Sequence, residues 1–372
     1  MKNKMLLSAL TLMVMALTIN PLDAAPKAKT RKSDVKNIIL MIGDGMGAAH
    51  ITQVMIDQKF APLNMNRAMG GGMVTTYSKN NRVTDSAAAA TAFATGQKTN
   101  NSKLSVDPDN NPMTTIIELA ERAGYATGVV ATSALVHATP AAFYAHAKKR
   151  YDSDTIAAQL LPSGIDVAFG AGKGNFDARK DGRDLLAEAR NAGYTVVDSI
   201  HKLDDVHSGK AIVAYPTGRN HLPMMLKGRG DYLPQATAKA LELLKSCSRK
   251  GMFLMVEGSL IDYGGHGNSE KDIVAETRDF DNAVGVAMDF ADQNPGTLVI
   301  ILADHETGGM TIVSNNADFT ESESGVKTRF STGSHSAVMV PLLTYGTGYE
   351  RVGGILDNTE IHDKICELLG LE

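Results

Sequence analysis

Four short clusters of acidic and histidine residues, together with one serine, are the residues of this chain that could carry out chemistry. The clusters lie at Asp44, along Glu257–His266, at Asp304–His305 and at His335. Side chains of these types avoid burial unless they are paired or hold a metal ion. If the clusters converge, they can hold two divalent ions, which clamp the attacking and leaving oxygens of an in-line displacement. The clusters therefore predict a two-metal site.

Ser86 stands directly before a run of small residues, Ala87–Ala90, that favours a helix. A serine in that position can cap the helix, with its hydroxyl turned toward the unpaired N–H groups of the first turn, where an anion also binds. A serine is a poor nucleophile at its free pKa, and metal coordination is one way to activate it. The segment alone leaves both interpretations, a cap and a nucleophile, open.

Residues 1–25 are predicted to be a secretory signal peptide of this 372-residue chain. Lysines near the start precede the apolar run Met5–Leu17, and small residues at Asp23–Ala25 suit cleavage. The run is short for a membrane span, and an uncleaved N-terminal anchor is the alternative. Residues 26–35 then form a basic leader and residues 36–372 a single domain without a membrane anchor. The sequence thus predicts a periplasmic or secreted protein.

The composition excludes several classes of protein. Hydrophobic residues make up 43% and charged residues 21%, as in a globular protein. The formal net charge of −4 gives no basic surface for nucleic acid. The cysteines Cys247 and Cys366 can pair in an exported protein, but the sequence does not establish their distance. No cysteine cluster exists for a thiolate zinc site, so a metal here requires histidine and carboxylate ligands.

The predicted elements alternate between strands and helices. Strands are expected at 37–42, 72–77, 126–131, 166–169, 194–197, 252–256, 297–302 and 337–343, and helices at 114–122, 183–190, 235–246, 272–290 and 359–369. This order predicts an α/β fold with a large, mostly parallel central sheet and helices on both faces. Residues 100–112 and 315–334 are expected to be polar loops. Three of the four clusters follow strands, where ligands of such sheets bind.

Six motifs, in this order, resemble those of the alkaline phosphatases in the metallophosphatase superfamily. They are Asp44–Gly47, Thr84–Ala88, His137–Ala141, Glu257–His266, Ala303–His305 and Gly333–His335. The resemblance implies the family's three-layer sandwich. It also implies hydrolysis of small phosphate monoesters to an alcohol and inorganic phosphate through a phosphoserine intermediate. Relatives of this family are commonly homodimers, although no interface is readable in the sequence.

The resemblance also implies roles for individual residues. Ser86 resembles the nucleophile and Arg150 the residue that clamps phosphate, since a guanidinium can pair two phosphate oxygens at once. The implied metals are two zinc ions and one magnesium ion. The implied ligands are Asp262, His266 and His335 for the first zinc, Asp44, Asp304 and His305 for the second zinc, and Asp44, Thr139 and Glu257 for the magnesium ion.

Three further residues are expected to support the site or to contact substrate: Asp85, His137 and Tyr263. His137 stands where many bacterial members have aspartate and vertebrate members have histidine. Imidazole suits zinc and magnesium prefers oxygen ligands, so the identity of the third metal stays open. Tyr263 stands where members often have lysine or histidine, and a phenol donates a hydrogen bond without bringing positive charge.

Other functions remain as alternatives. A phosphodiesterase of the same superfamily usually lacks the third metal site and the arginine clamp, so Thr139, Glu257 and Arg150 argue against it. A sulfatase is disfavoured because no Cys-x-Pro-x-Arg-like context is present. An inactive, metal-stabilised relative would be expected to have lost Ser86 or some ligands, and none is missing.

Overall fold

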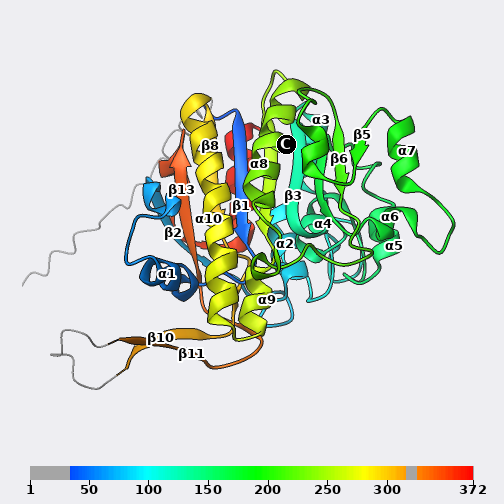
Figure 1. The fold of residues 1–372 in the computed structure, drawn as a ribbon. Helices are drawn as coiled ribbons and strands as arrows, with labels where there is room; N and C mark the ends of the chain where they lie inside the picture. Colours follow the sequence, from blue (N-terminus) through cyan, green and yellow to red (C-terminus); the bar gives the residue numbers. More distant parts are fainter. Residues whose placement is uncertain (1–33, 316–324, 372) are drawn as a thin grey trace, which may run out of the picture. The chain divides into compact units, whose positions relative to one another are not determined.

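Unbroken runs of apolar residues form the central strands of one large sheet in the computed structural model of the chain, which describes residues 34–315 and 325–371. The predicted signal peptide, residues 26–33 of the basic leader and residues 316–324 lie outside this part. In strand β1 (Asn37–Gly43), every residue after the first is buried, because helices cover both faces of the sheet (Figure 1).

The sheet has ten strands, nine of which run in one direction. The order is β14 (Gly354–Asp357), β2 (Gly70–Thr75), β13 (Val340–Gly346), β8 (Thr297–Leu302), β1, β7 (Met252–Gly258), β3 (Ala126–Ala134), β4 (Val167–Ala171), β6 (Ala211–Ala214) and β5 (Thr195–Val197). Only β13 is antiparallel to its neighbours in this sheet, β8 and β2. The predicted α/β fold with a mostly parallel sheet is confirmed.

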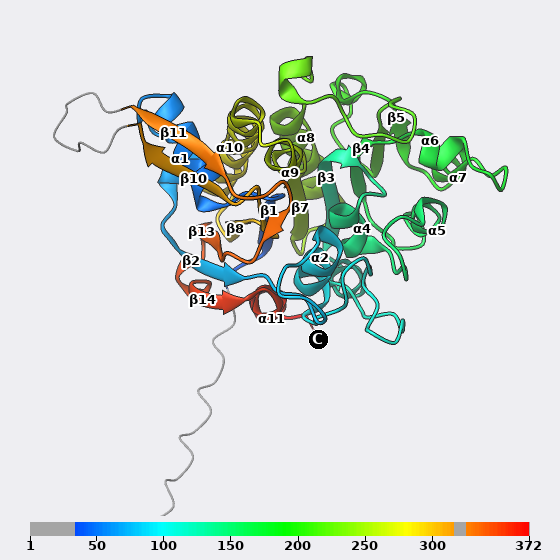
Figure 2. The same ribbon diagram turned by 90° about the horizontal axis from the view of Figure 1, so that it is seen from below.

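Helices cover the two faces of the sheet in separate groups, as Figure 2 shows. One face carries α1 (Ala48–Asp57), α8 (Tyr232–Cys247) and α10 (Glu270–Gln293), and the other carries α2 (Ser86–Thr95), α3 (Ile116–Arg122), α4 (Ala138–Tyr144) and α11 (Asn358–Leu369). Shorter helices are α5 (Ser153–Ala157), α6 (Gly174–Asp177), α7 (Leu185–Asn191) and α9 (Ile261–His266), with 3-10 turns at Asn64–Arg67, Ile200–Leu203, Met225–Lys227 and Tyr349–Arg351. The long apolar stripe of α10 packs on β1, β7 and β8.

Two sequence predictions need correction. The expected loop at 315–334 contains strand β11 (Val326–Phe330), which pairs antiparallel with β10 (Met310–Ser314) in a two-stranded ribbon. The residues of β11 are exposed or half-buried, so the segment lacks the apolar run that identified the other strands. The strand expected at 337–343 begins later, at Val340. The short strand β12 (His335–Ser336) precedes it in the sequence and pairs with β9 (Glu306–Thr307).

The two cysteines do not form a disulfide. Cys247 ends α8 and Cys366 lies in α11, and both are free thiols. The two helices cover opposite faces of the sheet (Figure 2). The pairing that the sequence left open is therefore absent from the structure.

Candidate active site

Three neighbouring strands deliver acidic residues to one edge of the sheet. In the parallel register Gly43 of β1 lies beside Gly258 of β7, and Ile42 of β1 lies beside Leu302 of β8. The residues at these strand ends therefore meet at one level, which places Asp44, Glu257 and Asp304 together. All three side chains are fully buried. A buried carboxylate needs a partner, and this edge of the sheet concentrates three of them.

Gly45 allows Asp44 to approach the other clusters. Its φ of +73° lies in the left-handed region, and a Cβ atom there would come within 2.7 Å of the Thr307 hydroxyl oxygen. Its backbone N–H donates to Asp304 Oδ1 at 3.1 Å. The turn after β1 is thus held against the turn after β8.

His305 lies at the centre of the first cluster. Its Nε2 atom is 3.4 Å from Asp44 Oδ1, 3.2 Å from Asp304 Oδ2 and 3.3 Å from Ser86 Oγ. Burial, the largest cause, and the nearby imidazole of His335 lower the pKa of His305 well below its usual value, so the ring is neutral.

Thr307 determines which nitrogen of His305 carries the hydrogen. Its hydroxyl donates to Asp262 Oδ1 at 2.5 Å, and its oxygen lies 3.2 Å from His305 Nδ1. Because the hydroxyl hydrogen is used by Asp262, the oxygen accepts from Nδ1–H. The lone pair of His305 Nε2 therefore faces the carboxyl groups of Asp44 and Asp304, an arrangement that suits a cation between them.

His266 and His335 show the same feature in the second cluster. Their Nε2 atoms lie 3.3 Å apart, while Nδ1 of His266 bonds to the carbonyl of Gly333 at 2.9 Å and Nδ1 of His335 to that of Thr84 at 2.8 Å. Carbonyl oxygens only accept, so both hydrogens sit on Nδ1 when the rings are neutral. The two Nε2 lone pairs then point at each other and at Asp262, whose oxygens lie 3.3 Å from His266 and 3.5 Å from His335. A proton or a metal ion is needed between them.

Oxygen atoms dominate a third cluster next to Asp44. Glu257 Oε2 accepts hydrogen bonds from Ser133 at 3.2 Å and from Ser259 at 2.5 Å. Among the described residues, both oxygens of Asp44, Oε1 of Glu257 and Oγ1 of Thr139 are buried without a hydrogen-bond partner. Such atoms are rare in folded proteins, and their concentration beside Asp44 fits a bound cation.

His137 lies beside this third cluster, and one of its nitrogens, together with Asp44 and Glu257, forms a set close enough to share an ion. Its Nε2 atom accepts a hydrogen bond from Arg150 at 3.2 Å. Burial, the largest cause, and the Arg150 charge lower the pKa of His137 well below its usual value. The ring is therefore neutral, and its Nε2 atom accepts the hydrogen bond from Arg150.

The electrostatics of the clusters favour a bound cation. Burial raises the pKa of Asp44 well above its usual value, and the charges of Asp304, Asp262 and Glu257 raise it further. Burial also raises the pKa of Asp304 to about 8, with Asp262 and Glu257 adding to the effect. Four carboxyl groups this close repel one another when ionised. Divalent ions would remove the repulsion and supply partners for the orphaned oxygens.

The start of α2 places Ser86 against this charge cluster. The sequence interpretation of Ser86 as a helix cap is wrong: the cap is Asp85, whose carboxylate accepts from the backbone N–H of Ala88 at 3.0 Å. Ser86 is the first helical residue, is only 2% exposed, and turns its hydroxyl toward His305. The capping role of Asp85 thus leaves the serine oxygen available for chemistry.

Asp85, the residue before Ser86, holds the side chain of Arg150 near the serine. The guanidinium of Arg150 donates to Asp85 Oδ2 at 3.1 Å, and the same oxygen accepts from the backbone N–H of Ser102 at 2.9 Å. The backbone N–H of Arg150 donates to the carbonyl of Ser102 at 2.8 Å. The loop expected at 100–112 therefore borders the site. The structure brings Asp85, Ser86 and Arg150 together at the helix start, where an anion is favoured.

The sequence predictions missed four residues of the site: Thr307, Ser133, Ser259 and His221. Ser259 lies inside a recognised motif and Thr307 just after another, but their roles depend on side chains distant in the sequence. His221 belongs to the segment between β6 and α8, and its Nε2 atom lies 2.6 Å from the hydroxyl of Tyr263. No periodic pattern or motif marks this histidine in the sequence.

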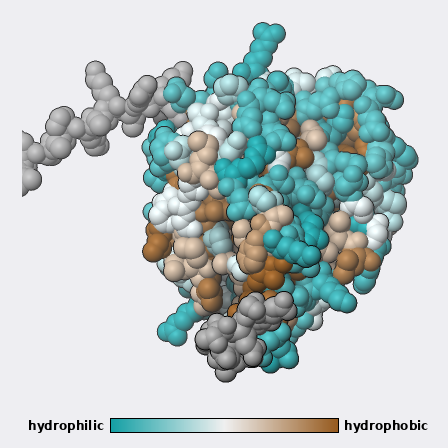
Figure 3. Space-filling model, turned by 60° about the vertical axis from the view of Figure 1, so that its left-hand side comes forward, coloured by the Kyte–Doolittle hydropathy of each residue, from teal (hydrophilic) through white to brown (hydrophobic). Residues whose placement is uncertain are grey.

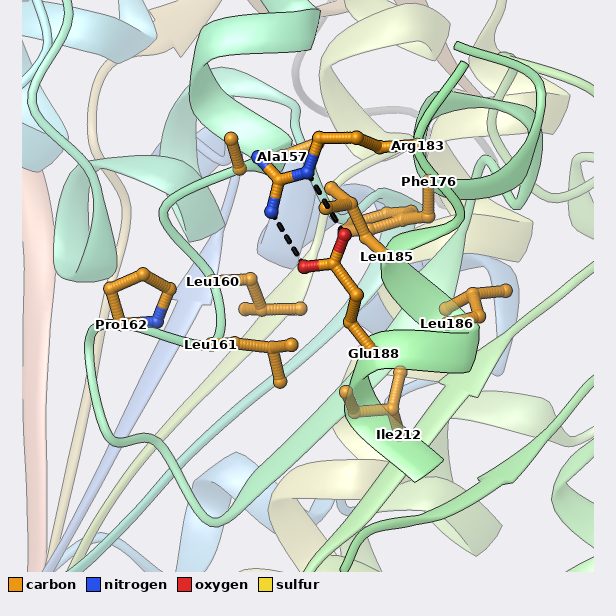
Figure 4. A pocket seen from close by; sticks show the side chains of 11 residues that line it. Ala157, Leu160, Leu161, Pro162, Phe176, Arg183, Leu185, Leu186, Glu188 and Ile212 are labelled. Atoms are coloured by element: carbon orange, nitrogen blue, oxygen red, sulfur yellow. Dashed lines mark hydrogen bonds and ion pairs between the residues drawn. The ribbon is translucent and has the colours of Figure 1, made fainter. Parts of the chain in front are cut away.

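Other hollows in the described chain lack such groups. Figure 4 shows one of about 310 Å³, lined by apolar side chains of α5 and α7 with the exposed ion pair of Arg183 and Glu188 at its edge. Another, of about 270 Å³, lies between α1 and β13 and is lined mainly by apolar side chains. Hydrophobic residues on the side turned forward in Figure 3 form separate small areas among hydrophilic ones. Neither hollow contains a cluster of metal-ligating side chains.

The fold and the site define an α/β protein with histidine and carboxylate clusters at strand ends, facing a serine at the start of a helix. The sequence profile of the family described as alkaline phosphatase matches residues 35–329. The chain therefore belongs to the alkaline phosphatase family, as its motifs predicted. Among the described residues, no helix combines the length and the apolar character needed to span a membrane.

Individual relatives support this assignment. Alkaline phosphatase 3 of Bacillus subtilis is 38% identical over 305 residues, which cover 78% of this chain and 65% of that protein. Alkaline phosphatase 4 of the same organism is 36% identical, over 85% of this chain and 72% of that protein. The chain thus spans about two thirds of the length of these relatives.

A solved structure matches the described fold closely. The alkaline phosphatase of the Antarctic bacterium TAB5 superposes with a TM-score of 0.84 at 37% identity, covering 92% of this chain and all of that chain. Two variants of that enzyme, in which one histidine is replaced by aspartate or glutamate, have magnesium bound in a site called M3.

The second cluster gives a prediction about pH. In protein stripped of metal by a chelator, the hydrogen bond to Asp262 raises the pKa of His266 to about 9, above the ordinary value of about 6.5. A raised folded-state pKa means that the protonated ring stabilises the fold below about pH 6.5 and that this contribution is lost as pH rises through about 9. The unfolding temperature of the stripped protein should therefore fall over this range in wild type and fall less in His266→Gln.

The matched control is His362→Gln on α11, outside the cluster, which should keep the wild-type slope. Equal slopes for wild type and His266→Gln would show that the interaction between His266 and Asp262 does not stabilise the folded protein.

Proposed function

We propose that this protein hydrolyses phosphate monoesters, with Ser86 as the nucleophile. One observation carries the proposal: Ser86 Oγ lies 3.3 Å from His305 Nε2, whose lone pair faces two buried carboxylates with unpaired oxygens. A cation bound at this position would lower the pKa of the hydroxyl, so that its proton is lost to solvent and the oxygen can attack phosphorus. Membership of the alkaline phosphatase family supports the same reaction.

The donor atoms suggest which metal each cluster holds. Asp262, His266 and His335 offer two imidazole nitrogens and a carboxylate. Asp44, Asp304 and His305 offer one imidazole and two carboxylates, and Asp262 is also close enough to share an ion with Asp44 and His305. Both sets suit zinc. Asp44, Thr139 and Glu257 offer only oxygens, which suit magnesium. When bound, the ions would lower the pKa of the serine hydroxyl and of water and would neutralise charge on the reacting oxygens.

His137 does not have to enter the third site. Its Nε2 atom accepts from Arg150, which leaves the hydrogen of the neutral ring on Nδ1. Within the part of the chain that the structure describes, that Nδ1 atom is buried without a partner, as are the oxygens of Asp44, Thr139 and Glu257, but only the oxygens carry free lone pairs. Magnesium is bound in the M3 site of two variants of the Antarctic enzyme in which a histidine was replaced by an acidic residue, whereas this protein has His137 beside the third cluster. We propose magnesium as the third ion of this protein on the basis of the three oxygen donors alone.

The reaction then proceeds in two displacements at phosphorus. Ser86 Oγ loses its proton, attacks phosphorus, and the bond between phosphorus and the ester oxygen breaks, which releases the alcohol after that oxygen is protonated. Water next attacks the phosphoserine, the bond between phosphorus and Oγ breaks, and inorganic phosphate leaves as Ser86 regains a proton. Arg150, aimed by Asp85, can hold two phosphate oxygens during both steps.

A monoester is favoured over a diester by the same groups. A monoester presents one more unsubstituted oxygen and more negative charge than a diester. Arg150 and the third cluster at Thr139 and Glu257 supply a cationic fork and a further ion site beside that oxygen. The alternative, a phosphodiesterase, would make no use of them.

We also propose export to the periplasm or the medium, on the basis of the signal-like segment 1–25.

The first test of this function compares matched substrates. Wild type should show a much higher kcat/KM for an aryl phosphate monoester than for the matched diester, and a chelator should abolish both activities. Arg150→Ala should lose about 10²-fold on the monoester and clearly less on the diester, because the diester offers fewer charged oxygens. Lys149→Ala, the removal of an exposed neighbouring cation, is the control and should change neither. A wild type that prefers the diester would establish the diesterase instead.

The second test concerns the covalent intermediate. Ser86→Ala should lose most monoesterase activity while it keeps the wild-type metal content, because the serine oxygen is the attacking atom. Acid quenching of wild type with radiolabelled phosphate should leave label on the peptide that contains Ser86. Label on a different residue, or unchanged turnover in Ser86→Ala, would refute the assignment.

The third test concerns Thr307, which orients both zinc clusters. Thr307→Val keeps the shape of the side chain but removes the donor to Asp262 and the acceptor for His305 Nδ1–H. We expect zinc affinity to fall by about 10–100-fold, measured by competition with a chromophoric chelator. Thr311→Val, the same change at an exposed position of β10, is the control. Unchanged zinc affinity in Thr307→Val would mean that this hydroxyl does not set the ligand geometry.

A further inference from the structure

His221 and Tyr263 form a hydrogen-bonded pair at the edge of the site, outside the three ligand clusters. We propose that His221 is a positioning residue that turns the Tyr263 hydroxyl into a hydrogen-bond donor for a phosphate oxygen of the substrate. The proposal rests on the proposed function, since it concerns the phosphate that Ser86 and Arg150 would bind.

The segment between β6 and α8 is fixed where it carries His221. The next residue, Leu222, donates its backbone N–H to the carbonyl of Thr132 at 3.1 Å. Further along, Arg229 is 1% exposed and donates to Asp279 of α10 at 2.8 Å, and it also pairs with Glu276. The segment is thus tied both to the sheet and to α10, so the imidazole of His221 is held in place.

A backbone N–H group determines the tautomer of His221. The N–H of Ala134, at the end of β3, donates to His221 Nδ1 at 3.0 Å. A nitrogen that accepts a hydrogen bond carries a lone pair, so the ring is neutral and its hydrogen is on Nε2. Nε2–H therefore donates to the hydroxyl oxygen of Tyr263, 2.6 Å away.

The consequence concerns the hydrogen of Tyr263. Since the phenol oxygen accepts from His221, its own O–H cannot point at that ring and must be donated elsewhere. With the opposite tautomer, Tyr263 would give its hydrogen to His221 and would present only lone pairs to an anion. The N–H of Ala134 thus selects the tautomer that makes Tyr263 a donor.

The neighbours of the pair indicate where that donor acts. The ring of His221 packs edge-on against His137 with centroids 4.9 Å apart, and His137 accepts from Arg150. Tyr263 directly follows Asp262 in α9 and remains 41% exposed, so a ligand can reach its hydroxyl. Arg150, His137, His221 and Tyr263 are therefore linked by successive contacts. In the proposed complex, the phosphate bound by Arg150 also accepts from the Tyr263 O–H.

Four variants separate the proposal from a merely structural role. Asparagine places its amide where Nδ1 of histidine lies, so His221→Asn keeps the bond from Ala134 but does not reach Tyr263. Glutamine extends to the position of Nε2, so His221→Gln can still donate to Tyr263. Tyr263→Phe removes the proposed donor itself. The double variant of Tyr263→Phe with His221→Asn tests whether the two residues act through one bond.

The measurement is the dissociation constant of inorganic phosphate by titration calorimetry on metal-loaded protein, with metal content checked in each variant. Tyr263→Phe should weaken phosphate binding by about tenfold, as expected for one lost hydrogen bond to a charged group. His221→Asn should weaken it by a large part of that factor, His221→Gln should stay near wild type, and the double variant should be no weaker than Tyr263→Phe.

Additive losses in the double variant, or equal losses in His221→Asn and His221→Gln, would overturn the positioning role. Wild-type phosphate affinity in Tyr263→Phe would overturn the donor. A wild type that neither hydrolyses monoesters nor binds phosphate would instead refute the proposed function, so the two failures are distinguishable.

Discussion

The structure depends on one electrostatic constraint: lone pairs and carboxylates at the strand ends face one another, so that a proton or a cation is needed between them. His305 turns the lone pair of Nε2 toward two carboxylates, and His266 and His335 turn theirs toward each other. Their Nδ1 hydrogens already bond to Thr307 and to two backbone carbonyls, so a change of tautomer does not relieve the repulsion, and an added proton or a bound cation is needed. Bound cations relieve it, and the rest of the site is arranged around the places where they would sit.

The fold satisfies this constraint by bringing distant segments to one edge of a parallel sheet. Strands β1, β7 and β8 are adjacent, although they are far apart in sequence, and their register aligns the residues that follow them. Helix α2 then presents Ser86 from the other side, and its cap residue Asp85 aims Arg150. The N-terminus of α2 thus positions both the expected nucleophile, Ser86, and the expected phosphate clamp, Arg150.

Much of this architecture could be predicted from the sequence, because β1, β7 and β8 are unbroken apolar runs and each is followed by chemically active residues. The sequence left open whether Ser86 caps α2, and the structure gives that role to Asp85. Both residue types are good caps, so only the backbone geometry separates them. Strand β11 was missed because its side chains are polar and partly exposed, as in a loop.

The supporting residues could not be found in the same way. His221 acts through Ala134 and Tyr263, which are 87 and 42 residues away, so its role exists only in the folded chain. The hydroxyl of Thr307 joins two ligand clusters, yet a threonine in a short strand has no distinguishing pattern. Which group donates and which accepts in these hydrogen bonds decides what the two side chains do, and residue type alone does not reveal it.

Anomalous X-ray diffraction at the zinc absorption edge, from crystals grown with zinc and without chelator, tests the central claim most directly. The account predicts two strong peaks, one bonded to Nε2 of both His266 and His335 and one bonded to Nε2 of His305 beside Ser86 Oγ. Crystals without either peak, in which a shared proton joins His266 to His335 and His305 keeps its present contacts, would contradict it.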